Sequence, residues 1–131
     1  MPAGTIWKGG SMDADSRQSS WRDVPLAQAR LWRGIFDDSC EGVDLRAQCP
    51  LCGAKSLHRW FYLDRVQPST SFGRNWRGPG SQWQWCSGCR SYEHSSGLVP
   101  DWWEPTFEIA LESLHHDPGP IELRRLQLNG S

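Results

Sequence analysis

Two pairs of closely spaced cysteines constrain the fold of this chain more than any other feature. Cys49 and Cys52 lie in the segment CPLCG, and Cys86 and Cys89 lie in CSGC, with 33 residues between the pairs. Two Cys-x-x-Cys pairs are a strong signal for a metal site, because each turn lets both sulfurs point at one ion. Four thiolates give zinc a closed tetrahedral shell without a position for water or substrate. We therefore predict one structural zinc ion.

Other interpretations of the cysteines fit less well. A thioredoxin-like redox site needs one such pair in a βαβ context. A zinc deaminase needs a His-x-Glu or Cys-x-Glu feature before Pro-Cys-x-x-Cys, whereas here Pro50 follows Cys49 and no such feature precedes either pair. Iron stays open as the metal, since four thiolates also suit it. Cys40 lies nine residues before Cys49; we expect a half-buried thiol at a helix end, with a regulatory thiol as the alternative.

The two cysteine turns resemble the knuckles of the zinc ribbon family, in which each knuckle ends a β-hairpin. CPLCG matches the first knuckle and WCSGCR the second, and the resemblance covers residues 48–93, about a third of the chain. It implies a β-hairpin core around zinc and says little about function. The gap between the knuckles is long for a minimal ribbon, so we predict an elaborated hairpin with its loop at 67–81.

The composition favours a small core that a metal stabilises. Apolar residues make up 37% of the chain, and 13 glycines and 9 prolines indicate long connections between few regular elements. A structural metal helps most in such a fold. Nine tryptophans compensate in part, because each can bury a large area. The tryptophans that we expect in the core are Trp32, Trp60, Trp85 and Trp103.

The order of sequence signals predicts one α+β domain over residues 23–131. Residues 1–22 are interpreted as an expression remnant and a flexible N-terminus. We expect a helix at 24–38 capped by Asp23, strands at 56–66, 82–85 and 91–95, and a turn at 96–97. A second helix is expected to begin at Pro105 and to stop at 117–120, and residues 121–128 could add an edge strand. The predicted architecture is a small zinc-ribbon β-hairpin core with an elaborated hairpin loop and two flanking helices.

The sequence contains no apolar run long enough for a signal peptide or a membrane span. We therefore expect a cytoplasmic protein with no membrane partner, in which cysteine pairs bind metal rather than form disulfides. The histidines have no serine or cysteine nucleophile motif beside them, and no phosphate-binding glycine motif is present. We predict no catalytic residues and no enzymatic activity.

A protein partner is the favoured functional interpretation. The net charge is −1, yet residues 91–122 hold seven acidic residues and no lysine or arginine. An acidic face speeds association with a basic partner, and tryptophan and arginine are enriched at interface hot spots. The predicted partner-binding residues are Trp76, Trp83, Trp102, Glu104, Glu108, Arg74 and Arg77.

In type, such a chain resembles the immunity proteins of bacterial toxin systems. The segment WCSGCRSYEHSSGLVPDWW, residues 85–103, also resembles a segment of uncharacterised small bacterial proteins of that sort. The resemblance implies an inhibitor whose partner is a basic toxin domain. Such an inhibitor neutralises its cognate toxin by occluding the surface of the toxin.

Binding of single-stranded RNA or DNA is the alternative function. The segment FGRNWRGPGSQWQW, residues 72–85, interleaves arginines that could contact phosphates with indoles that could stack on unpaired bases. The net charge of −1 and the acidic C-terminal third oppose this alternative, because they would repel a phosphate backbone.

Overall fold

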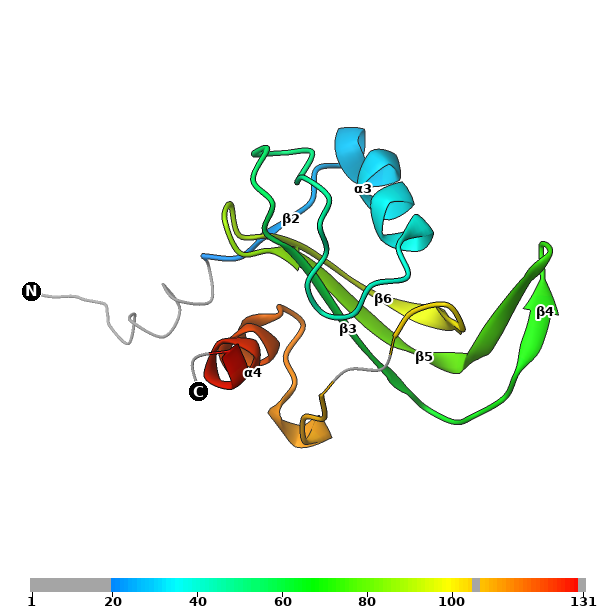
Figure 1. Ribbon diagram of the computed structural model, residues 1–131. Coiled ribbons are helices and arrows are strands. Elements are labelled where there is room, and N and C mark those ends of the chain that lie inside the picture. The colour runs from blue at the N-terminus through cyan, green and yellow to red at the C-terminus, as the bar shows by residue number, and fades with distance from the viewer. Residues whose placement is uncertain (1–19, 105–106, 130–131) are drawn as a thin grey trace, which may run out of the picture.

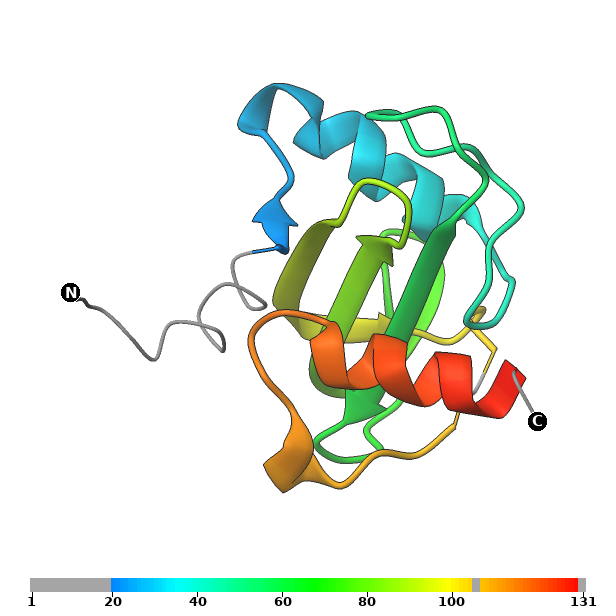
Figure 2. The same ribbon diagram turned by 90° about the vertical axis from the view of Figure 1, so that its left-hand side faces the viewer.

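The structure, a computed structural model, describes residues 20–104 and 107–129. A mixed five-stranded sheet lies between two α-helices, α3 (Leu26–Asp38) on one face and α4 (Gly119–Asn129) on the other (Figures 1 and 2). The predicted α+β class is confirmed. Neither helix, nor any other in the described part of the chain, has the length and apolar character needed to cross a membrane.

The sheet is built around one long strand. The strands follow the order β2 (Arg22–Asp23), β6 (Ser91–Pro100), β5 (Arg74–Cys86) and β3 (Leu57–Leu63), with β4 (Ser69–Ser71) paired to the N-terminal end of β5. β2 runs parallel to β6, and the other pairs are antiparallel. β5 therefore joins the region of the second cysteine pair to the hairpin that it forms with β4.

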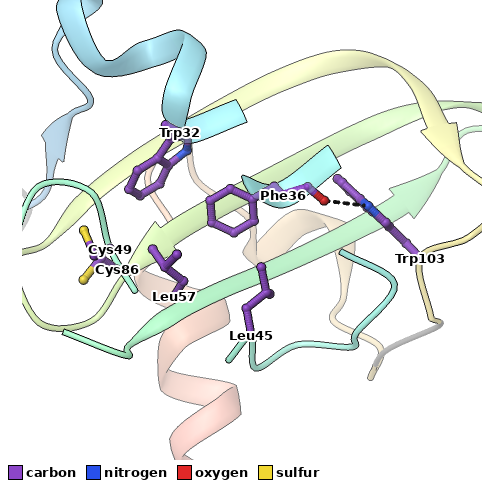
Figure 3. Packing of buried hydrophobic residues seen from close by; sticks show 7 residues of the cluster. All are labelled: Trp32, Phe36, Leu45, Cys49, Leu57, Cys86 and Trp103. Atoms are coloured by element: carbon purple, nitrogen blue, oxygen red, sulfur yellow. Dashed lines mark hydrogen bonds between the residues drawn. The ribbon is translucent and has the colours of Figure 1, made fainter. Parts of the chain in front are cut away.

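Each face of the sheet has its own apolar cluster. On the α3 face, Trp32, Phe36, Leu57 and Trp103 pack with Cys49 and other buried residues. Figure 3 shows this cluster running from the cysteines at one end to Trp103 at the other. Because both faces are covered, the first four residues of β3 are all buried.

The second cluster lies on the α4 face and is mainly aromatic. Trp60, Trp83 and Trp85 pack there with Tyr92 and Ile121. The four tryptophans predicted for the core are at most 2% exposed, which confirms their structural role; they are Trp32, Trp60, Trp85 and Trp103. The tryptophans supply much of the core that a chain poor in aliphatic residues requires.

The N-terminal part of the fold differs in detail from the prediction. α3 is preceded by Pro25 without a side-chain cap, while Asp23 lies in β2, so the predicted capping role of Asp23 is wrong. Trp21 is buried and Arg22 pairs with Ser91, which places both residues within the fold rather than in a flexible segment. Residues 1–19 of the predicted flexible segment lie outside the described residues.

The two C-terminal predictions are wrong. Pro105 lies outside the described residues, and from Phe107 to Pro118 the chain is irregular except for a 3-10 helix at Leu111–Ser113. Residues 121–128 belong to α4 instead of an edge strand. The side-chain carboxylate of Asp117 accepts a hydrogen bond of 2.8 Å from the Gly119 N–H, so the segment 117–120 starts a helix where we expected one to stop.

The expected loop at 67–81 is largely paired strand. Residues 69–71 form β4, and β5 begins at Arg74. Two of the glycines here allow close packing: a Cβ on Gly80 would lie 2.1 Å from the Tyr62 carbonyl oxygen, and one on Gly78 would lie 2.4 Å from that of Arg65. The predicted turn at 96–97 is also wrong, because β6 continues to Pro100.

Candidate metal centre

The fold brings the four predicted metal ligands together. Their sulfur atoms all lie within 4.8 Å of one another. Cys49 and Cys52 lie in the turn before β3, Cys86 ends β5, and Cys89 lies in the turn between β5 and β6. Cys49 and Cys86 are buried and Cys52 is exposed. Pairing of β3 with β5 therefore assembles one site from knuckles far apart in the sequence.

The sulfur spacing fits a tetrahedral metal site. Sγ of Cys49 lies 3.8 Å from Sγ of Cys89, and Sγ of Cys52 lies 3.7 Å from Sγ of Cys86. A tetrahedron with metal–sulfur bonds of about 2.3 Å has sulfur–sulfur edges of about 3.8 Å. A disulfide requires about 2.05 Å. The donor set thus suits one tetrahedral ion, and its four sulfurs make zinc the plausible metal.

Both knuckles are closed by the same backbone hydrogen bond. The residue after the second cysteine of each pair, Gly53 or Arg90, has a positive φ, 80° and 65° respectively. Its N–H donates to the carbonyl of the first cysteine, at 2.8 Å in the first knuckle and 3.0 Å in the second. Gly88 serves another purpose, because a Cβ there would lie 2.9 Å from the Ser56 hydroxyl oxygen.

The charge state of the thiols depends on their surroundings. Burial raises the pKa of Cys49 to about 12, although N–H groups of Leu51 and Cys52 oppose the change. Burial acts in the same direction on Cys89, but hydrogen bonds from the hydroxyl and N–H of Ser91 outweigh it and lower the pKa to about 7. A bound cation would compensate the negative charge of four thiolates held this close together.

A hydrogen-bonded chain supports the second knuckle. Nδ1 of His58 lies 2.8 Å from an Asp44 carboxylate oxygen, and its Nε2 lies 2.9 Å from the Ser87 hydroxyl. The Ser87 N–H donates to the Ser56 carbonyl at 2.9 Å, and the Ser56 hydroxyl lies 3.0 Å from Sγ of Cys86. These contacts fix the peptide that carries the ligand Cys86.

The same chain has the acid–imidazole–hydroxyl order of a hydrolase triad. His58, however, is only 6% exposed, and its ring lies against Trp85 with centroids 5.7 Å apart. Ser87 sits between two metal ligands, with its backbone N–H bonded to the Ser56 carbonyl. We therefore interpret the chain as support for the metal centre. Sequence reasoning missed it because its members are 14 and 29 positions apart.

The structure separates the predicted partner-binding residues into groups. Arg74, Trp76 and Trp102 meet where the β4–β5 hairpin joins the sheet. The rings of Trp76 and Trp102 are 5.1 Å apart in an edge-to-face arrangement, and the Arg74 guanidinium lies 4.7 Å from the Trp102 ring. Glu104 and Glu108 are exposed, and Glu108 lines a separate groove beside α4.

Two of the predicted contact residues make hydrogen bonds within the fold. Trp83 is 3% exposed, and its ring N–H donates to the carbonyls of His115 and His116, so it offers little surface to a partner. Arg77 donates to the carbonyls of Pro100 and Asp101, at 3.1 and 3.0 Å, and to that of Trp103. Arg77 thereby fastens β5 to the chain that follows β6.

An open groove lies beside the arginine–tryptophan cluster. We call it the arm-base groove; its volume is about 510 Å³, and it is lined by Asp37, Asp38, Gly73, Arg74, Asn75, Asp101 and Trp102. The Trp102 ring N–H donates to the Asp37 carbonyl at 2.7 Å, and Arg74 lies 3.9 Å from Asp38. Burial and the neighbouring Asp38 charge raise the pKa of Asp37. Three aspartates against one arginine leave the groove acidic.

No protein-family model matches the sequence, and no curated protein or solved structure is significantly similar to it. The resemblance to zinc ribbons therefore rests on the two knuckles.

Proposed function

We propose that the chain is a non-catalytic protein-binding module, stabilised by zinc, that contacts its partner through the arm-base groove. The placement of Trp102 carries this proposal. Its indole is held by the hydrogen bond to Asp37 and the contact with Trp76, yet it borders a groove open to solvent. Tryptophan is among the residues most enriched at binding hot spots. A side chain that is already ordered loses less conformational entropy on binding.

The charges around the groove favour a basic partner. Asp37, Asp38 and Asp101 line it with one arginine, and exposed Glu104 extends the acidic surface. Other acidic residues are engaged internally, Glu93 with Arg33 and Glu122 with Arg125. An acidic binding surface steers a basic protein into contact and raises the association rate. In its specific form, the proposal is neutralisation of a basic toxin domain by occlusion of its surface.

Nucleic-acid binding is the weaker alternative. Of the two arginines in the segment 72–85, Arg77 is bonded to backbone carbonyls, which leaves Arg74 beside the groove. Affinity for a phosphate backbone grows with the number of phosphates that arginine and lysine neutralise. Aspartates around the one available arginine would oppose that contact.

The test is an affinity capture from native lysate with the zinc-loaded full chain, with and without nuclease. We expect a stoichiometric protein partner that survives nuclease and that inhibits growth when expressed without this chain. Charge reversal by Asp38→Lys and Asp101→Lys should slow association with the purified partner by about tenfold or more. Glu112→Lys, at an exposed carboxylate on the 3-10 helix, is the matched control and should have little effect.

Capture of RNA or DNA that is released at raised salt would instead favour the alternative. An association rate unchanged by charge reversal would remove the groove from the proposal.

A further inference from the structure

The β4–β5 hairpin projects from the sheet as an arm, which we define as residues 69–76 (Figure 1). Its strands pair from Ser69 with Trp76 to Ser71 with Arg74, so that Phe72 and Gly73 form a two-residue turn at the tip. Both turn residues have positive φ, 53° and 72°. This is the pattern of a type I′ hairpin turn, for which Asn-Gly is the favoured sequence.

Phe72 is an unfavourable residue at this position for two independent reasons. A bulky side chain is disfavoured at positive φ. The side chain is also 97% exposed, the largest exposed fraction among the large hydrophobic residues of the described chain. Nothing in the described chain provides a ring or cation partner for it. Residues held in strained backbone conformations are concentrated at functional sites.

Hydrogen bonds within the arm and at its base hold the backbone that carries Phe72 in a fixed position. The Thr70 hydroxyl donates to the Asn75 side-chain oxygen at 3.0 Å, and the Trp76 ring N–H donates to the Ser71 carbonyl at 3.3 Å. At the base, the Asp101 N–H donates to the Asn75 carbonyl at 3.1 Å, and Arg77 makes the carbonyl contacts described above. Phe72 is therefore presented by an ordered hairpin, which reduces the entropy cost of inserting it into a partner.

We propose that Phe72 is the anchor that inserts into an apolar pocket on the protein partner, and that this pocket has a basic rim. The inference rests on the proposed function and names the residue that penetrates the partner. Gly73 and Arg74 follow Phe72 directly and line the arm-base groove. The tip and the groove are thus parts of one surface, in which Phe72 requires an apolar pocket and the aspartates require basic side chains beside it.

Membranes and nucleic acids fit these observations less well as partners of Phe72. A single phenylalanine buries less apolar surface than a myristoyl chain, which itself gives only marginal membrane binding. Anionic lipid would also meet the aspartates of the groove. A nucleic-acid base could stack on Phe72, but its phosphates would meet the same carboxylates. A protein pocket is the occupant that fits both the apolar tip and the acidic groove.

The test uses the zinc-loaded full chain with Phe72→Asn, which creates the favoured Asn-Gly turn. We expect the thermal midpoint to stay the same or to rise by a few degrees, because the turn strain is relieved. Affinity for the purified partner should fall about 30-fold or more, as for a hot-spot residue. The matched control is Leu26→Asn on α3, where the leucine is 92% exposed, and its affinity should stay within threefold of wild type.

A photo-crosslinker, p-benzoylphenylalanine, placed at position 72 or at position 26 gives an independent readout in native lysate. We expect position 72, and not position 26, to crosslink to the same protein whose affinity depends on Phe72. Phosphatidylcholine–phosphatidylglycerol vesicles and a thymidine oligonucleotide serve as probes of the other occupants. Binding of either probe that is lost with Phe72→Asn would overturn the proposal.

The results separate the anchor from the wider function. If Phe72→Asn binds the partner within threefold of wild type while charge reversal at Asp38 and Asp101 slows association, the anchor is wrong and the binding module stands. If no protein binds the wild-type chain, both fail. A lowered thermal midpoint for Phe72→Asn would refute the strain argument, because Phe72 would then stabilise the fold.

Discussion

Replacing Arg59 by methionine should destabilise the fold far more than its position on a strand suggests. Arg59 is fully buried, and its guanidinium donates to the Phe36 carbonyl at 3.0 Å, the Ser39 carbonyl at 3.1 Å and the Glu41 carbonyl. It also lies over the Trp103 ring, 4.3 Å from the centroid. One side chain therefore satisfies carbonyls at and beyond the end of α3, where a helix leaves them without internal partners.

The expected loss combines two opposing effects. Each buried carbonyl left without a donor costs about 1–3 kcal/mol. Burial lowers the pKa of Arg59 to about 10, so removing the charge recovers roughly 3 kcal/mol of desolvation. The Phe36 carbonyl keeps donors in the Ser39 N–H and the Trp103 ring N–H, so the carbonyls that lose their donor are those of Ser39 and Glu41. Two carbonyls at about 2 kcal/mol each and about 2 kcal/mol for the cation–π contact with Trp103 exceed the recovered desolvation by about 3 kcal/mol. The thermal midpoint of Arg59→Met should therefore fall by roughly 10 °C.

Urea unfolding of the zinc-loaded chain, followed by tryptophan fluorescence, measures this loss. Arg46→Met is the matched control, because Arg46 bonds Glu41 with a side chain that is 91% exposed. An exposed ion pair of this kind contributes less than about 1 kcal/mol. The role of Arg59 in binding these carbonyls is refuted if the free energy of unfolding of Arg59→Met lies within 1 kcal/mol of wild type. It is also refuted if Arg59→Met loses no more unfolding free energy than Arg46→Met does.

Two further substitutions test the packing of the sheet and of α4. Gly80→Ala should destabilise strongly, because its Cβ would lie 2.1 Å from the Tyr62 carbonyl oxygen, whereas Gly42→Ala meets nothing within 4 Å and should be nearly neutral in thermal unfolding. Burial alone would raise the pKa of Glu122, but hydrogen bonds, chiefly from Arg125, lower it below its ordinary value of 4.5. The stabilisation from ionised Glu122 is therefore full above pH 4.5 and is lost as the pH falls through the lower folded-state pKa. Glu122→Gln should flatten this part of the stability profile, and an unchanged acid slope would contradict the assignment.

The sequence predicted those parts of the fold that short-range patterns encode. The Cys-x-x-Cys spacing identified all four sulfurs that the structure brings together. Helical periodicity placed α3 close to its observed bounds. The shortage of aliphatic residues correctly assigned four tryptophans to the core, since the aliphatic side chains are too few to fill it without them.

The errors arose where long-range contacts decide the local structure. Residues 107–118 carry an apolar stripe at helical spacing, yet the indole N–H groups of Trp60 and Trp83 bond to carbonyls of this segment. Such contacts fix the chain in an irregular path despite its helical pattern. Gly78 and Gly80 indicated a loop, but they allow neighbouring backbone to approach within a sheet. No short-range signal distinguishes these two uses of glycine.

The structure brings together only some of the residues that we predicted to contact a partner. Arg74, Trp76 and Trp102 do meet, because β5 and the end of β6 lie side by side at the base of the arm. Trp83 also lies on β5, but its side chain packs in the second cluster. Whether an indole in this region faces a partner or the core depends on strand register, which the sequence alone did not fix.

The metal content of the purified full chain tests the central claim most directly. Cys52 and Cys40 are both exposed, so serine at either position changes little packing, and only Cys52 belongs to the four-sulfur cluster. Elemental analysis and native mass spectrometry should find one zinc per chain in wild type and in Cys40→Ser, and less than one in Cys52→Ser. Structural zinc binding contributes about 10–16 kcal/mol, comparable to the whole stability of a domain, so Cys52→Ser should also lose cooperative unfolding. Wild type that lacks metal, or Cys52→Ser that keeps both zinc and cooperative unfolding, would contradict the account.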